Sequence, residues 1–268
     1  MNSFQNKVVL ITGGASGIGR IMCRLCLERN ATVIIWDLNQ TGIDETISAF
    51  SVKGKITGYQ LDVSIISQIK ASAEKVKHDI GTVDILINNA GIIVGKFFHE
   101  HSTEDILKTM EINAIAPMTI TGEFLDDMIA QDSGHICNIA SSGGLISNPK
   151  MSVYAASKWS LIGWSDSVRL EMKQLKKNVN VTTIMPYYIN TGMFDGVKSK
   201  LPILNPEAAS LTIITAIENN KKMVTLPGYI YRITRLSQAI LPINWFDWIA
   251  DSVLGIYKTM EHFTGRKK

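Results

Sequence analysis

The sequence predicts an α/β fold in which helices flank both faces of one doubly wound parallel sheet. Short apolar segments rich in β-branched residues alternate with segments of helical periodicity. The first apolar segment runs directly into a glycine-rich turn, and no repeat or linker breaks the alternation. We therefore expect a seven-stranded sheet domain over residues 1–228 and an amphipathic helical extension over residues 229–268.

Composition assigns the chain to the globular proteins. Of its 268 residues, 46% are hydrophobic and 19% are charged, which favours a packed core over disorder. The net charge of +3 is too small for a nucleic-acid-binding protein. Residues 1–7 are polar and unlike a signal peptide, and no apolar run reaches the ~18 residues that span a membrane. We expect a cytoplasmic protein, and we expect any contact with a membrane to be made by the C-terminal extension.

Two short motifs that resemble redox or metal sites are interpreted as structural. Cys23 and Cys26 form C-x-x-C inside a helical segment, where this spacing places both side chains on one core face. The three cysteines suit a reduced compartment and give no disulfide framework. His99 and His101 form H-x-H, but no third ligand follows at a suitable spacing, so we expect no metal site.

The first strand and helix form a site suited to a phosphate group. A strand over residues 7–12 precedes the glycine-rich turn, and a helix over residues 20–29 follows it. Glycines let the backbone approach a pyrophosphate, and the free N–H groups at a helix start point towards it. The candidate cofactor-binding residues in this turn are Gly13, Ser16, Gly17, Ile18 and Gly19.

An acidic residue after the second strand favours NAD as the cofactor. The strand over residues 32–36 ends at Asp37, 18 residues after Gly19. A carboxylate at this position accepts hydrogen bonds from the adenosine ribose hydroxyls and repels a 2′-phosphate. Leu38 follows, so no cation stands where NADP would need one. Arg20 lies near enough in the chain to keep NADP as the less favoured alternative.

The next two strands end in further cofactor candidates. Helices are expected over residues 43–53 and 65–80, and strands over residues 56–61 and 83–87. Asp62 and Val63 leave a strand end on the adenine side, although a helix N-cap by Asp62 or Ser64 explains them equally well. Residues 88–91 read N-N-A-G, a turn that suits a backbone close to the cofactor. Asn89, Ala90 and Gly91 are the candidates in that turn.

The second half of the chain continues the alternation. A helical stretch over residues 103–131 is expected to break at Pro117, and Asn113 occupies its middle, where a helix former is the default. The alternative for Asn113 is a bond to a neighbouring carbonyl. A strand over residues 134–140 ends at Ser141, at the carboxyl edge where such sheets bind ligands. Further strands are expected over residues 179–185 and 222–226, and Pro186 and Thr191 follow the first of these.

Tyr154 and Lys158 lie one turn apart in a predicted helix over residues 152–175. A phenol with a pKa near ~10 is a poor acid or base at neutral pH. An ammonium beside it favours the phenolate and moves proton transfer towards pH ~7. Ser141 precedes Tyr154 by 13 residues, so one loop separates them. The alternative interpretation is a helix-surface pair with no special role.

Together and in this order, these motifs resemble the short-chain dehydrogenase/reductase family over about residues 7–226. Within it, the chain is most similar to the subgroup of 17β-hydroxysteroid dehydrogenase type 11 and epidermal retinol dehydrogenase, including I-I-W-D-L-N at residues 34–39 and the long tail. The matching residues are T-G-x-x-x-G-I-G at 12–19, N-N-A-G at 88–91, Asn113, Ser141, Tyr154 and Lys158.

The resemblance implies a Rossmann-type fold and an NAD(P)-dependent oxidoreductase that interconverts an alcohol with a ketone or aldehyde by hydride transfer. It assigns Tyr154 as general acid/base, with Lys158 lowering its pKa and binding the nicotinamide ribose. Ser141 then holds the reacting oxygen, and Asn113 anchors a water that relays the proton through Lys158. Homodimers or homotetramers are usual for the family.

The pocket around the nicotinamide departs from the family pattern. Thr191 is implied to hold the carboxamide, and Pro186 is implied to contact the cofactor. The family usually has glycine after this proline, whereas Tyr187 stands there in this chain. A side chain is therefore expected where backbone normally approaches the cofactor.

Two other functions use related residues. A nucleotide-sugar epimerase or dehydratase also relies on tyrosine and lysine, but usually carries a larger C-terminal substrate domain. A non-catalytic dinucleotide-sensing protein tends to have lost one of Ser141, Tyr154 or Lys158, and all three are present.

The tail after residue 228 has three interpretations. Pro242 divides it into two amphipathic helical segments. They pack on the body or another subunit, contact a membrane surface through a Trp/Arg face, or cover an elongated apolar substrate. All three fit a lipophilic substrate, such as a steroid-, retinoid- or fatty-alcohol-like molecule.

Overall fold

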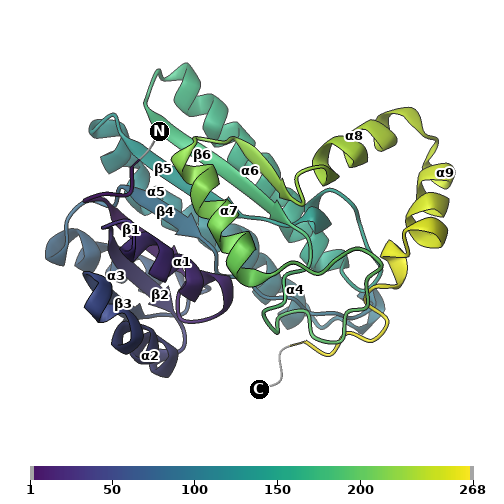
Figure 1. Cartoon of the computed structure of the whole chain (residues 1–268), viewed down its shortest axis with the longest axis horizontal. Coiled ribbons are helices and arrows are strands. Elements are labelled where there is room, and N and C mark those ends of the chain that lie inside the picture. Colours follow the sequence, from purple (N-terminus) through teal and green to yellow (C-terminus); the bar gives the residue numbers. More distant parts are fainter. Residues whose placement is uncertain (1–2, 266–268) are drawn as a thin grey trace.

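Seven parallel strands form one sheet in the computed structural model, which describes residues 3–265 (Figure 1). Their order is β3-β2-β1-β4-β5-β6-β7, so the winding direction reverses between β1 and β4. Doubly wound sheets bind ligands at the carboxyl ends of strands beside such a reversal. The predicted fold class is confirmed. The strands are β1 (Val8–Thr12), β2 (Thr32–Asp37), β3 (Ile56–Gln60), β4 (Ile85–Asn88), β5 (Gly134–Ile139), β6 (Val179–Pro186) and β7 (Met223–Leu226).

Helices cover both faces of the sheet, and each face has its own apolar core. On one face lie α1 (Gly17–Leu27), α2 (Gln40–Phe50) and α7 (Pro206–Glu218). On the other lie α3 (Ile66–Asp79), α4 (Thr103–Met110), α5 (Ala116–Ala130) and α6 (Ser152–Gln174).

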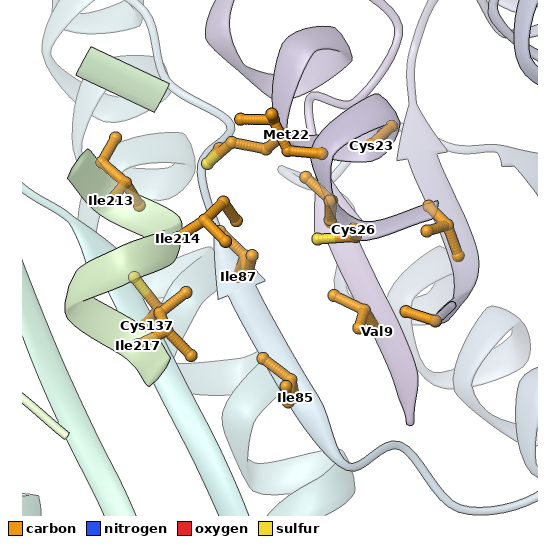
Figure 2. Packing of buried hydrophobic residues seen from close by; sticks show 14 of the residues in the cluster. Val9, Met22, Cys23, Cys26, Ile85, Ile87, Cys137, Ile213, Ile214 and Ile217 are labelled. Atoms are coloured by element: carbon orange, nitrogen blue, oxygen red, sulfur yellow. The ribbon is translucent and has the colours of Figure 1, made fainter. Parts of the chain in front are cut away.

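The two cysteines of the C-x-x-C motif belong to the first of these cores. Helix α1 packs against α7, and Figure 2 shows Met22 and Cys26 of α1 in one cluster with Ile214 of α7 and Val9 of β1. Cys23 and Cys26 are both free and buried, and burial raises the pKa of each thiol. The pair shares a core face, as the helical spacing predicts.

The helical stretch before β5 breaks earlier than predicted. A π-helical turn, η3 (Glu111–Ile115), separates α4 from α5, and Pro117 lies in the first turn of α5. Helix α5 continues directly from this turn, where the Ala116 N–H donates to the Glu111 carbonyl, so Pro117 lies where the helical hydrogen-bond pattern changes. The break therefore falls on Asn113, and the expectation of an interruption at Pro117 is wrong.

Helix α7 was missed although its start carries a local signal. The Asn205 side chain accepts a hydrogen bond from the Ala208 N–H at 3.1 Å, and Pro206 occupies the first turn. Asparagine followed by proline is a common way to begin a helix. The apolar helix α7 connects β6 to β7 and so forms the last crossover connection of the sheet.

The C-terminal extension consists of α8 (Ile230–Ile240), α9 (Ile243–Trp248) and a segment that returns to the body. Figure 1 shows α8 and α9 projecting beyond the sheet. The two helices separate at Pro242, as predicted. Between residues 3 and 265, no helix is both long and apolar enough to cross a bilayer. The division into 1–228 and 229–268 stays a prediction, and residues 1–2 and 266–268 of it lie outside the described residues.

Candidate active site

A cavity of about 570 Å³ at the carboxyl edge of the sheet brings the predicted site residues together. Of the predicted residues, Gly19 and Asn113 do not line it. Those that do are Gly13, Ser16, Gly17, Ile18, Asp37, Asp62, Val63, Asn89, Ala90, Gly91, Ser141, Tyr154, Lys158, Pro186 and Thr191.

The glycine-rich turn leaves room for a phosphate group because side chains are excluded there. Gly13 and Gly17 adopt φ values of 66° and 54°, which favour glycine. A Cβ on Gly19 would collide with the Gly13 carbonyl oxygen and lie 2.7 Å from Asn89 Nδ2. Gly19 therefore acts by close packing beneath the turn. Residues at the start of α1 face the cavity, which presents a helix N-terminus to an anion.

Asp37 braces this turn from the end of β2. One carboxylate oxygen accepts a hydrogen bond from the Ala15 N–H, and the other accepts one from the Asn39 N–H, both at 3.0 Å. Its side chain also lines the cavity. Arg20 turns away, with Nη1 3.9 Å from a Glu45 carboxylate oxygen and its guanidinium 5.7 Å from the centre of the Phe50 ring. The Asp37 carboxylate therefore faces the cavity, while the Arg20 guanidinium faces α2.

Asp62 and Ser64 form a turn and do not cap a helix. The Asp62 carboxylate accepts hydrogen bonds from the N–H and hydroxyl of Ser64 at 2.9 and 2.7 Å. The N-cap of α3 is Ile65. The capping explanation for Asp62 or Ser64 is therefore wrong, and the Asp62–Ser64 turn holds Val63 against the cavity.

The loop after β4 is fastened to the glycine-rich turn. Asn89 Nδ2 donates to the carbonyl oxygens of Thr12 and Gly13 at 2.9 and 3.2 Å. The Thr12 hydroxyl accepts from the N–H groups of Asn89 and Ala90, both at 3.0 Å. These bonds hold the loop after β4 against the glycine-rich turn at the edge of the cavity.

Asn113 lies beside the site, and its side chain is occupied. Its Oδ1 accepts from the Ile92 N–H at 2.9 Å, and its Nδ2 donates to the Ile92 carbonyl at 2.9 Å and to Ser157 Oγ at 3.1 Å. Ser157 in turn donates to the Tyr154 carbonyl at 2.7 Å. The carbonyl that Asn113 bonds therefore lies 21 residues away and not next to it in the chain, and these contacts tie the loop after β4 to α6.

Tyr154 and Lys158 meet in the cavity on one face of α6. Lys158 Nζ lies 5.8 Å from the centre of the Tyr154 ring and donates to the Ile139 carbonyl at 2.9 Å. Both side chains are buried, with 5% and 4% of their surfaces exposed. The Ser141 hydroxyl accepts from the Gly143 N–H at 3.0 Å and lines the same cavity.

Burial shifts both ionisable groups away from their charged forms. It raises the pKa of Tyr154 to about 12, against an opposing hydrogen bond from Ser141, and it lowers the pKa of Lys158 to about 8. The expectation that the ammonium moves the phenol towards neutral pH is therefore wrong for the protein alone. Desolvation of the phenolate by burial is the largest cause of this shift. Lys158 nevertheless remains mostly protonated near pH ~7.

Aromatic and apolar residues complete the cavity beyond Tyr154, and most of them belong to no recognisable motif. Tyr187 occupies the position expected for glycine, and its hydroxyl lies 3.0 Å from Ser199 Oγ. Tyr188 packs against its ring at 4.6 Å between ring centres. The wall continues into the C-terminal extension, whose lining residues are Tyr229, Ile230, Ile233, Thr234, Leu254 and Ile256.

His99 and His101 of the H-x-H motif lie in and just after a short 3-10 helical turn. Both ring nitrogens of His101 are buried without a hydrogen-bond partner. The described residues contain no group of three or more histidine, cysteine or acidic side chains that could hold a metal.

Comparisons with known proteins point to one family. The family model for short chain dehydrogenases matches residues 7–202. Epidermal retinol dehydrogenase 2 of Mus musculus is 37% identical over 98% of this chain and 86% of its own length. Estradiol 17-beta-dehydrogenase 11 of Homo sapiens is 33% identical over 90% of this chain and 81% of its own length.

A solved structure supports the fold. The short-chain dehydrogenase/reductase from Burkholderia phymatum in complex with NAD superposes with a TM-score of 0.82 at 22% identity, covering 89% of this chain and 95% of that one. The fold, the family match over most of the sheet and the relatives above 30% identity lead to one assignment. This chain belongs to the short-chain dehydrogenase/reductase family and is a nicotinamide-dinucleotide-dependent oxidoreductase acting on CH–OH groups.

Proposed function

We propose that the protein uses NAD to interconvert a lipophilic secondary or allylic alcohol with its ketone or aldehyde. The observation that carries the proposal is a single cavity containing Tyr154, Lys158 and Ser141 at one end and an apolar wall at the other. The names of the relatives in the comparisons, a retinol and an estradiol dehydrogenase, support a steroid- or retinoid-like substrate.

The residues present fit a dinucleotide. Gly13 and Gly17 provide a side-chain-free turn, and the start of α1 offers N–H groups to the pyrophosphate. Asp62 and Val63 would flank the adenine, while Asn89, Ala90 and Gly91 would lie along the middle of the molecule. Pro186 and Thr191 would contact the nicotinamide end, and a bound nicotinamide supplies the hydride acceptor or donor.

The preference for NAD is supported by the end of β2. The Asp37 carboxylate lines the cavity and would accept hydrogen bonds from the ribose hydroxyls. Its negative charge opposes a 2′-phosphate, and the Arg20 side chain points to α2. NAD therefore meets complementary groups and NADP does not.

Each catalytic residue has a role that follows from its position. Tyr154 takes the hydroxyl proton during oxidation and returns it during reduction, while Ser141 holds the reacting oxygen. Lys158 places a buried positive charge beside the phenol and is available to the nicotinamide ribose. Asn113 holds α6, the helix that carries Tyr154 and Lys158, by its hydrogen bond to Ser157. The proposal also includes a water held by Asn113 that relays the proton through Lys158 to solvent.

The test is an assay of the purified protein with NAD and a panel of retinol, steroid and medium-chain alcohols, following absorbance at 340 nm. The proposal predicts NADH formation that is greatest for long apolar alcohols. Tight NADH binding without turnover of any alcohol would contradict it and favour a sensing protein.

The exposed side of the C-terminal extension supports peripheral contact with a lipid surface. Ile233 lines the cavity and is also 57% exposed, so apolar surface continues from the opening onto α8. Ile240, Ile243 and Trp245 extend it along α8 and α9. Vesicles of neutral phosphatidylcholine should sediment the wild-type protein and should retain less of an Ile240→Ser/Trp245→Ser variant. Equal retention would contradict the contact.

The remaining expectations for assembly are also proposals. A homodimer or homotetramer with closed symmetry follows from the family, and light scattering of the purified protein tests it directly. The two-part organisation, with residues 1–228 as the dinucleotide-binding and catalytic unit and 229–268 as an extension, is tested by expressing residues 1–228 and measuring NADH binding. Loss of binding in a folded fragment would contradict that division.

A further inference from the structure

The chain after α9 returns to the body of the protein as a strap, defined here as residues 256–265 (Figure 1). Ile256, Thr259 and Met260 are 8%, 1% and 1% exposed. Main-chain hydrogen bonds join the strap to the loop after β6. The Lys198 N–H donates to the Thr259 carbonyl at 3.2 Å, and the Thr264 N–H donates to the Asp195 carbonyl at 2.9 Å.

A buried polar cluster fastens the strap to two loops distant in sequence. Asn148 Nδ2 donates to Thr259 Oγ1 at 2.8 Å and to the Tyr188 hydroxyl at 3.2 Å. The hydroxyls of Tyr188 and Thr259 lie 2.9 Å apart. Thr259 also donates to the Ile256 carbonyl at 2.8 Å, so its oxygen acts as acceptor for both partners. Because the cluster is buried, a polar group that lost its hydrogen bond here would be left without a partner and would destabilise the folded state.

The cluster lies one layer of side chains behind the catalytic tyrosine. Asn148 and Tyr188 line the same cavity as Tyr154. The ring of Phe194 contacts the Tyr188 ring at 5.0 Å and the Tyr154 ring edge-on at 6.1 Å between centres. Met151, the residue before α6, places its sulfur 3.7 Å from the Tyr188 hydroxyl. The strap is thereby connected to the wall around the reacting centre.

We propose that Thr259, through Asn148 and Tyr188, is a specificity-determining residue that holds the far wall of the substrate site for long apolar alcohols. Ile256 of the strap and Leu254 just before it line the cavity. A long substrate reaches from Tyr154 to this wall, whereas a small alcohol ends before it. Release of the strap therefore weakens binding of the long substrate and leaves the chemistry at Tyr154 in place. The inference rests on the proposed function.

The experiment compares Thr259→Val, which removes the hydroxyl at nearly constant volume, with Thr259→Ser, which keeps it. Thr259→Val is expected to raise the KM of retinol or estradiol about tenfold, while kcat and the KM of NAD stay within about twofold. Thr259→Ser should restore the wild-type KM. Tyr188→Phe, which also loses a hydroxyl of the cluster, should act in the same direction as Thr259→Val.

The matched control is Thr212→Val on the exposed side of α7, where the hydroxyl donates to the Ala208 carbonyl of its own helix. It should leave all constants unchanged. The inference would be overturned if the KM of the long alcohol were unchanged in both Thr259→Val and Tyr188→Phe. It would also be overturned if these variants lost kcat and NAD affinity to the same extent as affinity for the long alcohol. A wild-type protein that oxidises neither long alcohol would overturn the proposed function instead.

Discussion

Replacement of Lys158 by methionine is expected to stabilise the protein against unfolding while it abolishes turnover. Burial lowers the pKa of Lys158 from 10.5 to about 8. At about 1.36 kcal/mol for each pH unit, this difference corresponds to a penalty of about 3 kcal/mol for folding near pH ~7. Methionine removes the penalty but loses the bond to the Ile139 carbonyl, which is worth about 1 kcal/mol. The net gain should be about 2 kcal/mol.

The sign of the effect follows from the two pKa values. Above the unfolded pKa of 10.5, the amine is neutral in both states and folding carries no penalty. As the pH falls towards the folded pKa of about 8, the unfolded chain takes up a proton that the folded protein refuses, so stability is lost. The penalty therefore shrinks from about 3 kcal/mol at pH ~7 to about 1.4 kcal/mol at pH ~9.5.

Equilibrium urea unfolding of wild type and Lys158→Met at these two pH values measures the difference. Lys173→Met, at an exposed position near the end of the same helix, is the matched control and should change stability little at either pH. The reasoning is refuted if Lys158→Met unfolds more easily at pH ~7, or if its advantage is the same at both pH values.

Two further predictions concern the cofactor. Gly19→Ala should abolish NADH binding, measured by fluorescence titration, because the new Cβ would collide with the Gly13 carbonyl. The control is Gly163→Ala, where nothing lies within 4 Å of the new Cβ. This variant should bind NADH normally and gain up to about 1 kcal/mol in stability. Normal NADH binding by Gly19→Ala would count against the packing argument. Asp37→Ala should lower the ratio of kcat/KM for NAD over NADP by at least about tenfold, a change of about 1.4 kcal/mol. A wild-type enzyme that already prefers NADP would show that Asp37 does not set the choice.

The sequence was sufficient for the sheet because its signals are local. Buried parallel strands are continuous apolar runs, and the glycine-rich turn follows the first of them directly. The relation of Tyr154 to Lys158 is likewise a property of one helix, so spacing alone placed both side chains on one face.

Features that depend on contacts between distant segments could not be predicted. Asn113 bonds to Ile92 and Ser157, which lie 21 and 44 residues away along the chain. Asn148 meets Thr259 across 111 residues, and neither belongs to a motif. Such pairs form only when the sheet brings their loops to the same edge.

The pKa of Tyr154 was misjudged for a related reason. Adjacency on a helix indicates that an ammonium is near the phenol, but the degree of burial follows from the whole fold. Residues such as Phe194, Tyr188 and Met151 surround the ring and remove water from it. The resulting desolvation raises the pKa of the phenol more than its neighbours lower it.

The central claim is that the Tyr154 phenol transfers the proton in an alcohol–carbonyl interconversion, and Tyr154→Phe tests it most directly. The variant keeps the ring and its packing but has no proton to exchange. NADH titration and absorbance at 340 nm, measured on wild type and variant with the best alcohol of the panel, separate binding from chemistry. The account predicts NADH affinity within about threefold of wild type and a loss of at least about a hundredfold in kcat. A Tyr154→Phe enzyme that turns over at the wild-type rate would contradict it.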